Sequence, residues 1–193
     1  MKLAEDVRSP FREDNKVRPE DRTAHDWYRF VLSFPPHLVR EYLKRFEVGS
    51  SERVLDPFCG TGTTLVECKK LGIPSVGLES NPMAAFASQV KVSWGIESAG
   101  LLAHARKVAE RASRRLERQG IEDIPMFGAQ AQPDVELRTP SPEAWKLLLK
   151  NCISPLPLHK TLVLLEVLEE LKDERFILHE RLALAKAVVC DIS

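Results

Sequence analysis

The residues best suited to chemistry in this chain form one continuous string that follows a short apolar segment. After Val54 and Leu55 the string reads Asp56, Pro57, Phe58, Cys59, Gly60, Thr61, Gly62, Thr63 and Thr64. Gly60 and Gly62 have no Cβ, so the backbone there can adopt positive φ and present its N–H groups to a ligand. Asp56 would stand at the carboxyl end of a strand, where open α/β sheets bind ligands. The string therefore predicts a nucleotide-type cofactor site.

A second acid stands at the distance from the turn that such a site requires. Residues 73–79 have the pattern of another apolar strand, and this strand ends at Glu79. In α/β nucleotide sites an acid roughly 20 residues beyond the turn accepts hydrogen bonds from ribose hydroxyl groups. Glu79 is thus the candidate ribose ligand, and the adjacent Ser80 and Asn81 belong to the same candidate site.

The string differs from two common phosphate-binding loops. No Gly-Lys-Ser/Thr follows the glycines, so it is not a Walker loop, and its spacing is not the Gly-x-Gly-x-x-Gly of dinucleotide sites. Instead, residues 56–64 resemble the first motif of S-adenosylmethionine-dependent amino-methyltransferases, especially those that methylate exocyclic amines of DNA bases. The resemblance extends over residues 24–94, and it implies S-adenosylmethionine as the cofactor.

An upstream segment adds to this resemblance. Phe34, Pro35 and Pro36 precede Leu38, which is similar to the Phe-Pro-x-x-Leu segment that closes over the methionine end of the cofactor in amino-methyltransferases. The resemblance implies that Asp56 and the turn hold the methionine part and that Glu79 holds the ribose. The implied cofactor-binding residues are Phe34, Pro36, Asp56, Pro57, Phe58, Cys59, Gly60, Thr61, Gly62, Thr63, Thr64, Glu79, Ser80 and Asn81.

Structural roles remain open for several of these residues. Asp56 could cap a helix, Glu79 could be a solvated strand end, and the pair Phe34 and Pro36 could be a hydrophobic staple in front of a helix. Cys59 lies inside the turn and out of reach of a base, so we expect a small buried thiol and not a nucleophile.

Composition limits the classes of protein to which the chain can belong. The 193 residues carry 28 Lys and Arg against 28 Asp and Glu, and 44% are hydrophobic, so we expect a soluble globular protein without a strongly basic surface. The four cysteines have no metal-ligand spacing and the chain has no signal peptide, which favours a cytoplasmic location. No apolar run reaches the roughly 20 residues that cross a bilayer.

The elements that must position the site indicate an α/β fold. We predict a charged amino-terminal arm over residues 1–23, a partial Rossmann-like methyltransferase core with two parallel strands over 24–97, and an α-helical insertion over 98–193. A leucine stripe at 162, 165, 168 and 171 predicts a core-facing side. An arginine-rich segment favours a solvated helix face over a phosphate-binding one. Helices are expected over 34–43, 82–94, 99–119, 142–151, 158–171 and 173–190. The core-facing side chains would be Leu38, Val39, Tyr42 and Leu43 in the first helix and Ala84, Ala85, Ala87 and Val90 in the second.

The motif that positions the target amine in the resembled family is absent from these 193 residues. It reads Asp/Asn/Ser-Pro-Pro-aromatic, and neither residues 34–37 nor residues 154–157 match it. We therefore expect no catalytic residue here, a chain truncated before that motif and inactive alone, and two partners: DNA, and a carboxyl-terminal half or second polypeptide. Two alternatives remain open: an RNA guanine-N2 methyltransferase, and a non-catalytic subunit or remnant that binds the cofactor.

Overall fold

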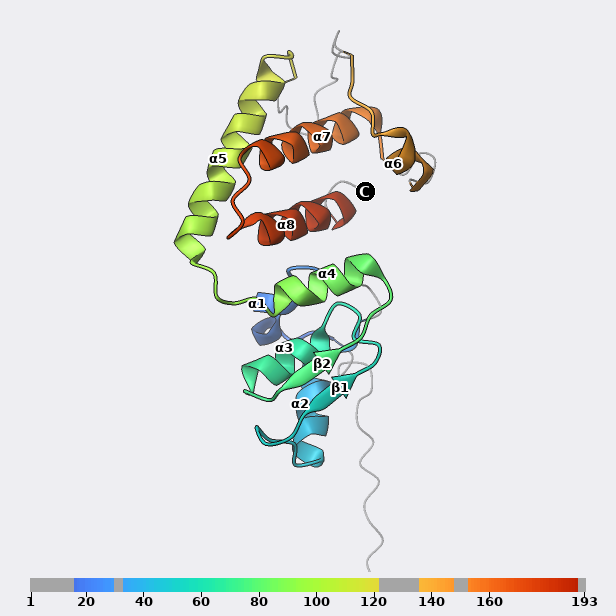
Figure 1. Ribbon diagram of the computed structural model, residues 1–193, viewed down its shortest axis with the longest axis vertical. Helices are drawn as coiled ribbons and strands as arrows, with labels where there is room; N and C mark the ends of the chain where they lie inside the picture. The colour runs from blue at the N-terminus through green and yellow to red at the C-terminus, as the bar shows by residue number, and fades with distance from the viewer. Residues whose placement is uncertain (1–15, 30–32, 122–135, 148–152, 191–193) are drawn as a thin grey trace, which may run out of the picture. The chain divides into compact units, whose positions relative to one another are not determined.

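The computed structural model describes residues 16–29, 33–121, 136–147 and 153–190 (Figure 1). Contacts between residues divide the chain into two compact units, residues 1–94 and 95–193. The first unit contains both described strands, and the second contains helices.

The first unit is built on a small parallel sheet. Strands β1 (Val54–Asp56) and β2 (Ser75–Gly77) pair with Leu55 opposite Val76 and Asp56 opposite Gly77. The helix α3 (Thr63–Lys70) connects them, as a parallel pair requires a crossover. The α/β class and the two predicted parallel strands are confirmed, and the sheet of the described residues has these two strands only.

Helix α3 is the centre of this unit, because it contacts α2, α4 and both strands. Helices α2 (Pro36–Arg45) and α4 (Pro82–Lys91) each begin with proline at the first position, where its fixed φ suits a helix and no N–H is needed. Ala84, Ala87 and Val90 of α4 are buried, as the sequence predicts for its inner side, whereas Ala85 of the same predicted set is only partly buried.

The apolar contact between α2 and α3 involves fewer α2 residues than expected. Val39 and Leu43 of α2 form a cluster with Cys68 and Ile73. Tyr42 was expected on the same core-facing stripe, but its side chain is 52% exposed and stacks on Phe46 with 6.1 Å between ring centroids. The prediction for Tyr42 is therefore wrong, because the core-facing stripe of α2 is narrower than its apolar pattern.

The end of the predicted amino-terminal arm has regular structure. Residues Pro19–Asp21 form the 3₁₀ helix η1, and Arg22–His25 form the short helix α1. Asp21 and His25 are buried. This part of the arm is thus tied to the first unit.

One face of the sheet is open to solvent. Leu55 and Val76, which lie opposite each other in the register, are 61% and 46% exposed, and Leu78 just after β2 is also exposed. Parallel sheets usually have both faces covered by helices. The described residues cover one face only.

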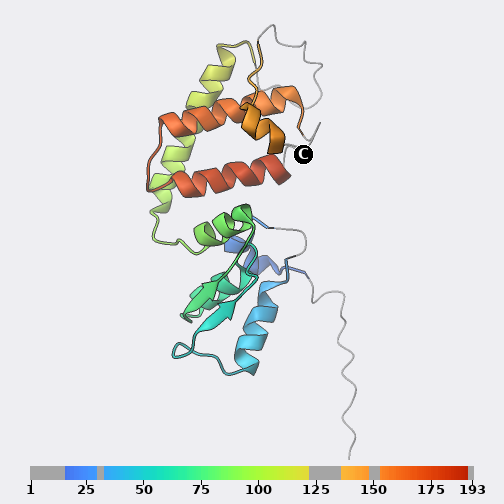
Figure 2. The ribbon, with the colours of Figure 1, turned by 45° about the vertical axis from the view of Figure 1, so that its right-hand side comes forward.

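The second unit consists of α5 (Ser98–Glu117), α6 (Pro142–Leu147), α7 (Pro155–Glu170) and α8 (Ile177–Cys190). Figure 2 shows α5 running across α7 and α8. The core cluster of the second unit combines Val108 and Ala112 of α5, Val167 and Leu168 of α7, and Ile177 of α8. The four predicted helices are confirmed, although residues 148–151 of the third lie outside the described residues.

Two expectations about the helices of the second unit have different outcomes. Of the predicted leucine stripe on α7, Leu168 belongs to the core cluster and the partly buried Leu171 packs against it, whereas Leu165 is 37% exposed, so the stripe faces the core only in part. Val163 and Val167 of the same helix are fully buried as well. The arginine-rich α5 uses Arg115 in ion pairs with Glu166 and Glu170 of α7, which gives this arginine a structural role.

No helix in the described part of the chain is both long enough and apolar enough to span a membrane.

Candidate functional site

The two predicted acids lie at the same edge of the small sheet. β1 ends at Asp56, and Glu79 follows β2 by two residues. The backbone N–H of Leu78 donates to the carbonyl oxygen of Asp56 at 2.9 Å, which extends the pairing of the strands to the start of the turn. The carboxyl ends of parallel strands meet at one edge, and this is why residues far apart in sequence come together.

A short set of local hydrogen bonds shapes the turn after β1. The Asp56 carboxylate accepts a bond from the Phe58 N–H at 3.1 Å, and the Gly62 N–H donates to the Cys59 carbonyl at 2.8 Å. The Cys59 N–H donates to the Leu78 carbonyl at 3.0 Å, which fixes the turn to the end of β2. Asp56 thus organises the turn, and α3 begins directly after Gly62.

Glu79 bridges the turn and the next helix. One of its carboxylate oxygens accepts a hydrogen bond from the Gly60 N–H at 2.8 Å, and the other accepts one from the Asn81 N–H at 2.7 Å. The Asn81 side chain caps α4 by accepting bonds from the N–H groups of Met83 and Ala84. Glu79 is therefore more than a solvated strand end, and Asn81 has a structural role of its own.

The two glycines of the turn differ in their surroundings. Both have positive φ, +52° at Gly60 and +84° at Gly62, which favours glycine. A Cβ at Gly60 would meet nothing within 4 Å and would point into open space, whereas a Cβ at Gly62 would lie 2.8 Å from the Ser88 Cβ. Gly60 therefore opens space for a ligand, and Gly62 allows α3 and α4 to approach.

The remaining residues of the turn divide into buried and exposed groups. Cys59 is buried, and burial raises the pKa of its thiol, so it is not an activated nucleophile. Thr61 and Thr63 are also buried, and Phe58 is 86% exposed. Pro57, Ser80 and Asn81 are exposed around the edge of the candidate site, and Thr64 is partly buried.

The upstream segment reaches the same part of the unit. Pro36 is buried at the start of α2, whereas Phe34 is 45% exposed. Phe34 and Thr64 line one apolar groove of about 390 Å³ together with Val54 and α2. Three residues after Phe34, the ring nitrogens of the buried His37 have no hydrogen-bond partner among the described residues.

The sequence analysis missed a buried cluster of charged side chains behind the turn. Glu67 of α3 is fully buried; its Oε1 accepts hydrogen bonds from His25 and Lys70, both at 2.7 Å, and its Oε2 accepts one from Arg40. The Arg40 guanidinium also forms two bonds to Asp21, at 2.7 Å and 3.0 Å. Glu67 lies among apolar residues of α3. An acid at such a position is the sequence feature that could have indicated this cluster.

The charges in this cluster compensate one another. Burial raises the pKa of Glu67, but the hydrogen bonds from His25, Lys70 and Arg40 outweigh it and lower that pKa to about 2. The hydrogen bonds that Arg40 donates to Asp21 and Glu67 raise the pKa of its guanidinium. Both groups are therefore charged at neutral pH, in a place where an unpaired charge would be very costly.

Lys91 is a second buried charge that the sequence analysis missed. Its side chain is 1% exposed, and its Nζ donates to the Tyr28 carbonyl at 3.1 Å. Burial lowers its pKa to about 8. The lysine thus connects α4 to the segment that follows α1.

Chemically, the sheet edge offers carboxylate acceptors, an open glycine turn and the start of a helix. Such an arrangement can bind hydroxyl groups and polar parts of a nucleoside-like ligand. The described residues hold no group of three or more His, Cys, Asp or Glu side chains placed to bind a metal ion.

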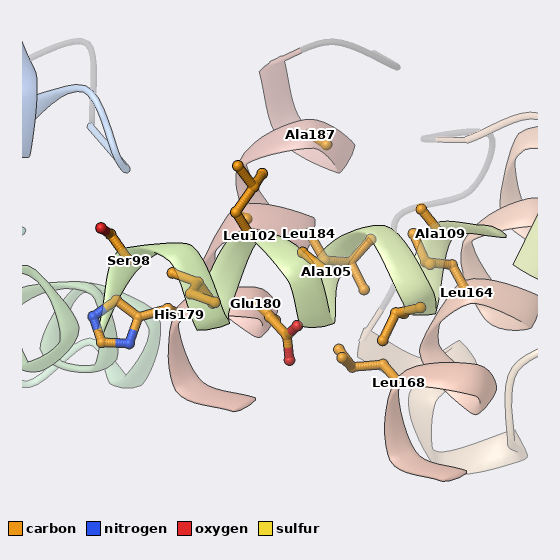
Figure 3. A pocket seen from close by; sticks show the side chains of 13 residues that line it. Ser98, Leu102, Ala105, Ala109, Leu164, Leu168, His179, Glu180, Leu184 and Ala187 are labelled. Atoms are coloured by element: carbon orange, nitrogen blue, oxygen red, sulfur yellow. The ribbon is translucent and has the colours of Figure 1, made fainter. Parts of the chain in front are cut away.

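A separate pocket in the second unit contains none of the predicted site residues. It has a volume of about 440 Å³ and is lined by apolar side chains of α5, α7 and α8, with Leu102, Leu168 and Leu184 among them (Figure 3). Glu180 also lines it, and this carboxylate bonds to His104 at 2.7 Å. Its apolar lining offers little for a reaction.

The comparisons with known proteins concern the first unit. The sequence profile of a family described as DNA methylase, the N6/N4 methyltransferases, matches residues 8–89. Type II methyltransferase M.BsoBI of Geobacillus stearothermophilus is 33% identical over 72 residues, which are 37% of this chain and 14% of that protein. Type II methyltransferase M.MjaII of Methanocaldococcus jannaschii is 41% identical over 69 residues, which are 35% of this chain and 13% of that protein.

An RNA-modifying relative also matches. A tRNA (guanine(10)-N2)-dimethyltransferase of Methanothermobacter thermautotrophicus is 35% identical over 65 residues, which are 34% of this chain and 18% of that protein. The matched part of the chain therefore spans less than a fifth of the length of each of these relatives. No solved structure matches the chain significantly.

Proposed function

We propose that residues 8–89, which match the DNA methylase family and resemble Type II methyltransferases, bind S-adenosylmethionine as the cofactor part of a DNA amino-methyltransferase. In this proposal the complete enzyme transfers a methyl group to the exocyclic amine of cytosine (N4) or adenine (N6). The family implies a methyl-donor cofactor, and S-adenosylmethionine is the specific donor that we propose.

The observation that carries this proposal is the bridge between Glu79 and Gly60. The hydrogen bond of 2.8 Å brings the second strand-end acid to the open glycine of the turn, beside Asp56. A carboxylate has about four lone-pair positions, so each Glu79 oxygen can accept a further bond beyond its backbone partner. Glu79 is thus able to hold the turn and bind two ribose hydroxyl groups together.

The other predicted residues have matching roles in the proposal. Asp56 and the turn from Gly60 to Gly62 hold the methionine part of the cofactor, and Phe34 and Pro36 close over it from α2. Phe34 supports this role because its ring is partly exposed and shares a groove with Thr64. The remaining candidates at the edge, Pro57, Phe58, Ser80 and Asn81, would contact the cofactor by their backbone or by exposed faces.

The cofactor supplies an activated methyl group, and the reaction is an in-line displacement that depends on alignment. A target base must leave the helix stack to reach such a site. The Asp/Asn/Ser-Pro-Pro-aromatic motif that would position its amine does not occur in this sequence. We therefore propose that another part of the protein, or a second polypeptide, supplies that motif together with most of the contact to DNA.

Titration calorimetry with S-adenosylmethionine tests the proposal. We expect the chain to bind the cofactor and the Gly60→Val variant to lose binding, because the new side chain fills the open space above the turn. Gly72→Val is the matched control: Gly72 also has positive φ, +69°, and open space around its Cβ position, but it lies after the far end of α3. Equal affinities of wild type and Gly60→Val would contradict the proposal.

A second candidate function has support from the tRNA dimethyltransferase relative. In that case the cofactor site would be the same and the acceptor would be a guanine N2 in RNA. Radiolabelled methyl transfer by this chain, supplied with the remaining part of the enzyme, distinguishes the two: label in mixed-sequence DNA supports the first candidate, and label in tRNA supports the second. Cofactor binding without transfer to either acceptor favours a non-catalytic cofactor-binding subunit.

A further inference from the structure

We propose that the charged cluster around the buried Glu67, formed with Asp21, His25, Arg40 and Lys70, positions the cofactor site, with Arg40 and Glu67 as positioning residues. This inference rests on the proposed function of the turn. The cluster joins η1, α1, α2 and α3, which are the elements in front of and directly behind the candidate site.

Helix α2 contacts α3 through a polar pair and an apolar pair. Arg40 of α2 bonds to Glu67 of α3, and Leu43 of α2 lies in one cluster with Cys68 of α3. Phe34 and Pro35 directly precede α2, and the glycine turn directly precedes α3, so the two helices follow the two predicted parts of the cofactor site.

Both members of the Arg40–Glu67 pair lie close to the start of their helix. Glu67 lies one helical turn after Thr63, and Arg40 lies one turn after Pro36. A shift of this contact would move the start of α2 relative to the start of α3. The cluster therefore sets the spacing between the segment in front of α2 and the glycine turn in front of α3.

Apolar packing alone already joins α2 to α3. Val39 and Leu43 of α2 form a cluster with Cys68 of α3 and with Ile73, which lies in the loop after α3. Buried ion pairs are weak sources of stability because desolvation offsets their attraction, whereas their geometry is specific. The Arg40 guanidinium forms a two-bond fork with Asp21 and uses one of the same nitrogens for Glu67, so a single arrangement of η1, α2 and α3 satisfies all these bonds.

The test compares variants of the cluster with a variant of the apolar contact. Arg40→Met removes the fork, Arg40→Lys keeps the charge without the fork geometry, and Glu67→Gln keeps the shape of the buried side chain. Ile73→Val is the control, since Ile73 follows α3 and belongs to the same apolar cluster as Val39 and Leu43 of α2, and the substitution leaves the charged side chains in place. Unfolding free energy and cofactor affinity are measured for each variant at a temperature at which it is folded.

We expect Arg40→Met and Glu67→Gln to weaken S-adenosylmethionine binding by about tenfold or more, and Ile73→Val to leave it unchanged. Arg40→Lys should recover affinity to within about threefold of wild type. Should Arg40→Met not fold, Glu67→Gln decides. Cluster variants that are folded and bind the cofactor as well as wild type would overturn the inference.

A second readout does not need the cofactor. The amide resonances of Gly60 and Gly62 should shift in the NMR spectra of Glu67→Gln and remain in place in Ile73→Val. If wild type binds no cofactor, the proposed function fails, and these resonances alone decide the positioning role. Unshifted glycine resonances in Glu67→Gln would then overturn it.

Discussion

Glu79 and Gly60 are 19 residues apart in sequence, and a carboxylate oxygen of Glu79 accepts a hydrogen bond from the Gly60 N–H at 2.8 Å. The bond holds the most open position of the turn against the end of the second strand. A ligand that binds there finds the loop already in place, so less conformational entropy is lost on binding. The acid therefore organises the turn, and in our proposal it also offers acceptors to the ribose.

This double role gives a prediction for Glu79. Glu79→Ala should weaken S-adenosylmethionine binding by about 1.5–3 kcal/mol for each charge-assisted bond that is lost. Calorimetry measures the change. Glu97→Ala is the matched control, because Glu97 accepts bonds from two backbone N–H groups at the start of α5 in the same manner but lies in the second unit. A change of less than about twofold in Glu79→Ala would show that the ribose assignment is wrong.

Gly62 should be the more sensitive of the two turn glycines in stability measurements. In Gly62→Ala the new Cβ would lie 2.8 Å from the Ser88 Cβ and 3.0 Å from the Ser88 Cα, at a φ of +84°. We expect a loss of about 1–3 kcal/mol in unfolding free energy from overpacking, in addition to the backbone strain. Urea titration followed by circular dichroism measures it, with Gly72→Ala as the control for strain alone. Equal losses in both variants would contradict the close approach of α3 and α4.

Lys91 should make the stability of the first unit depend on alkaline pH. Its pKa is about 8 in the folded protein, below the ordinary value of 10.5, so the unfolded chain binds more protons between these values. Unfolding free energy should therefore rise as the pH rises from about 8 to about 10.5. Lys91→Met removes this contribution, and the difference between the two urea-titration series isolates it. Parallel curves for wild type and Lys91→Met would refute the prediction.

Glu67 should contribute to stability in the opposite pH range. Its pKa is about 2 in the folded protein against an ordinary 4.5, so its contribution is complete above about pH 4.5 and is lost as the pH falls towards 2. Wild type should lose more stability than Glu67→Gln over this range. Chemical denaturation at a series of acidic pH values tests this, and the same loss in both proteins would exclude a paired Glu67.

Local sequence determined the centre of the candidate site. The strand, the glycine turn and the following helix occur as predicted, because positive φ at Gly60 and Gly62 and the apolar residues on either side are local requirements. The helices α2 and α4 were equally predictable, since proline at the first position and apolar spacing do not depend on distant residues. The assignment of Glu79 to ribose stays a prediction.

Only the tertiary structure decided which side chains meet. The partners of Glu67 lie 42 and 27 residues away at His25 and Arg40, and no local pattern specifies such pairs. The exposure of Tyr42 and of Leu165 likewise depends on where neighbouring helices pack. Sequence periodicity determines that a helix has an apolar side, whereas the rotation and neighbours of that helix depend on the packing of the whole unit.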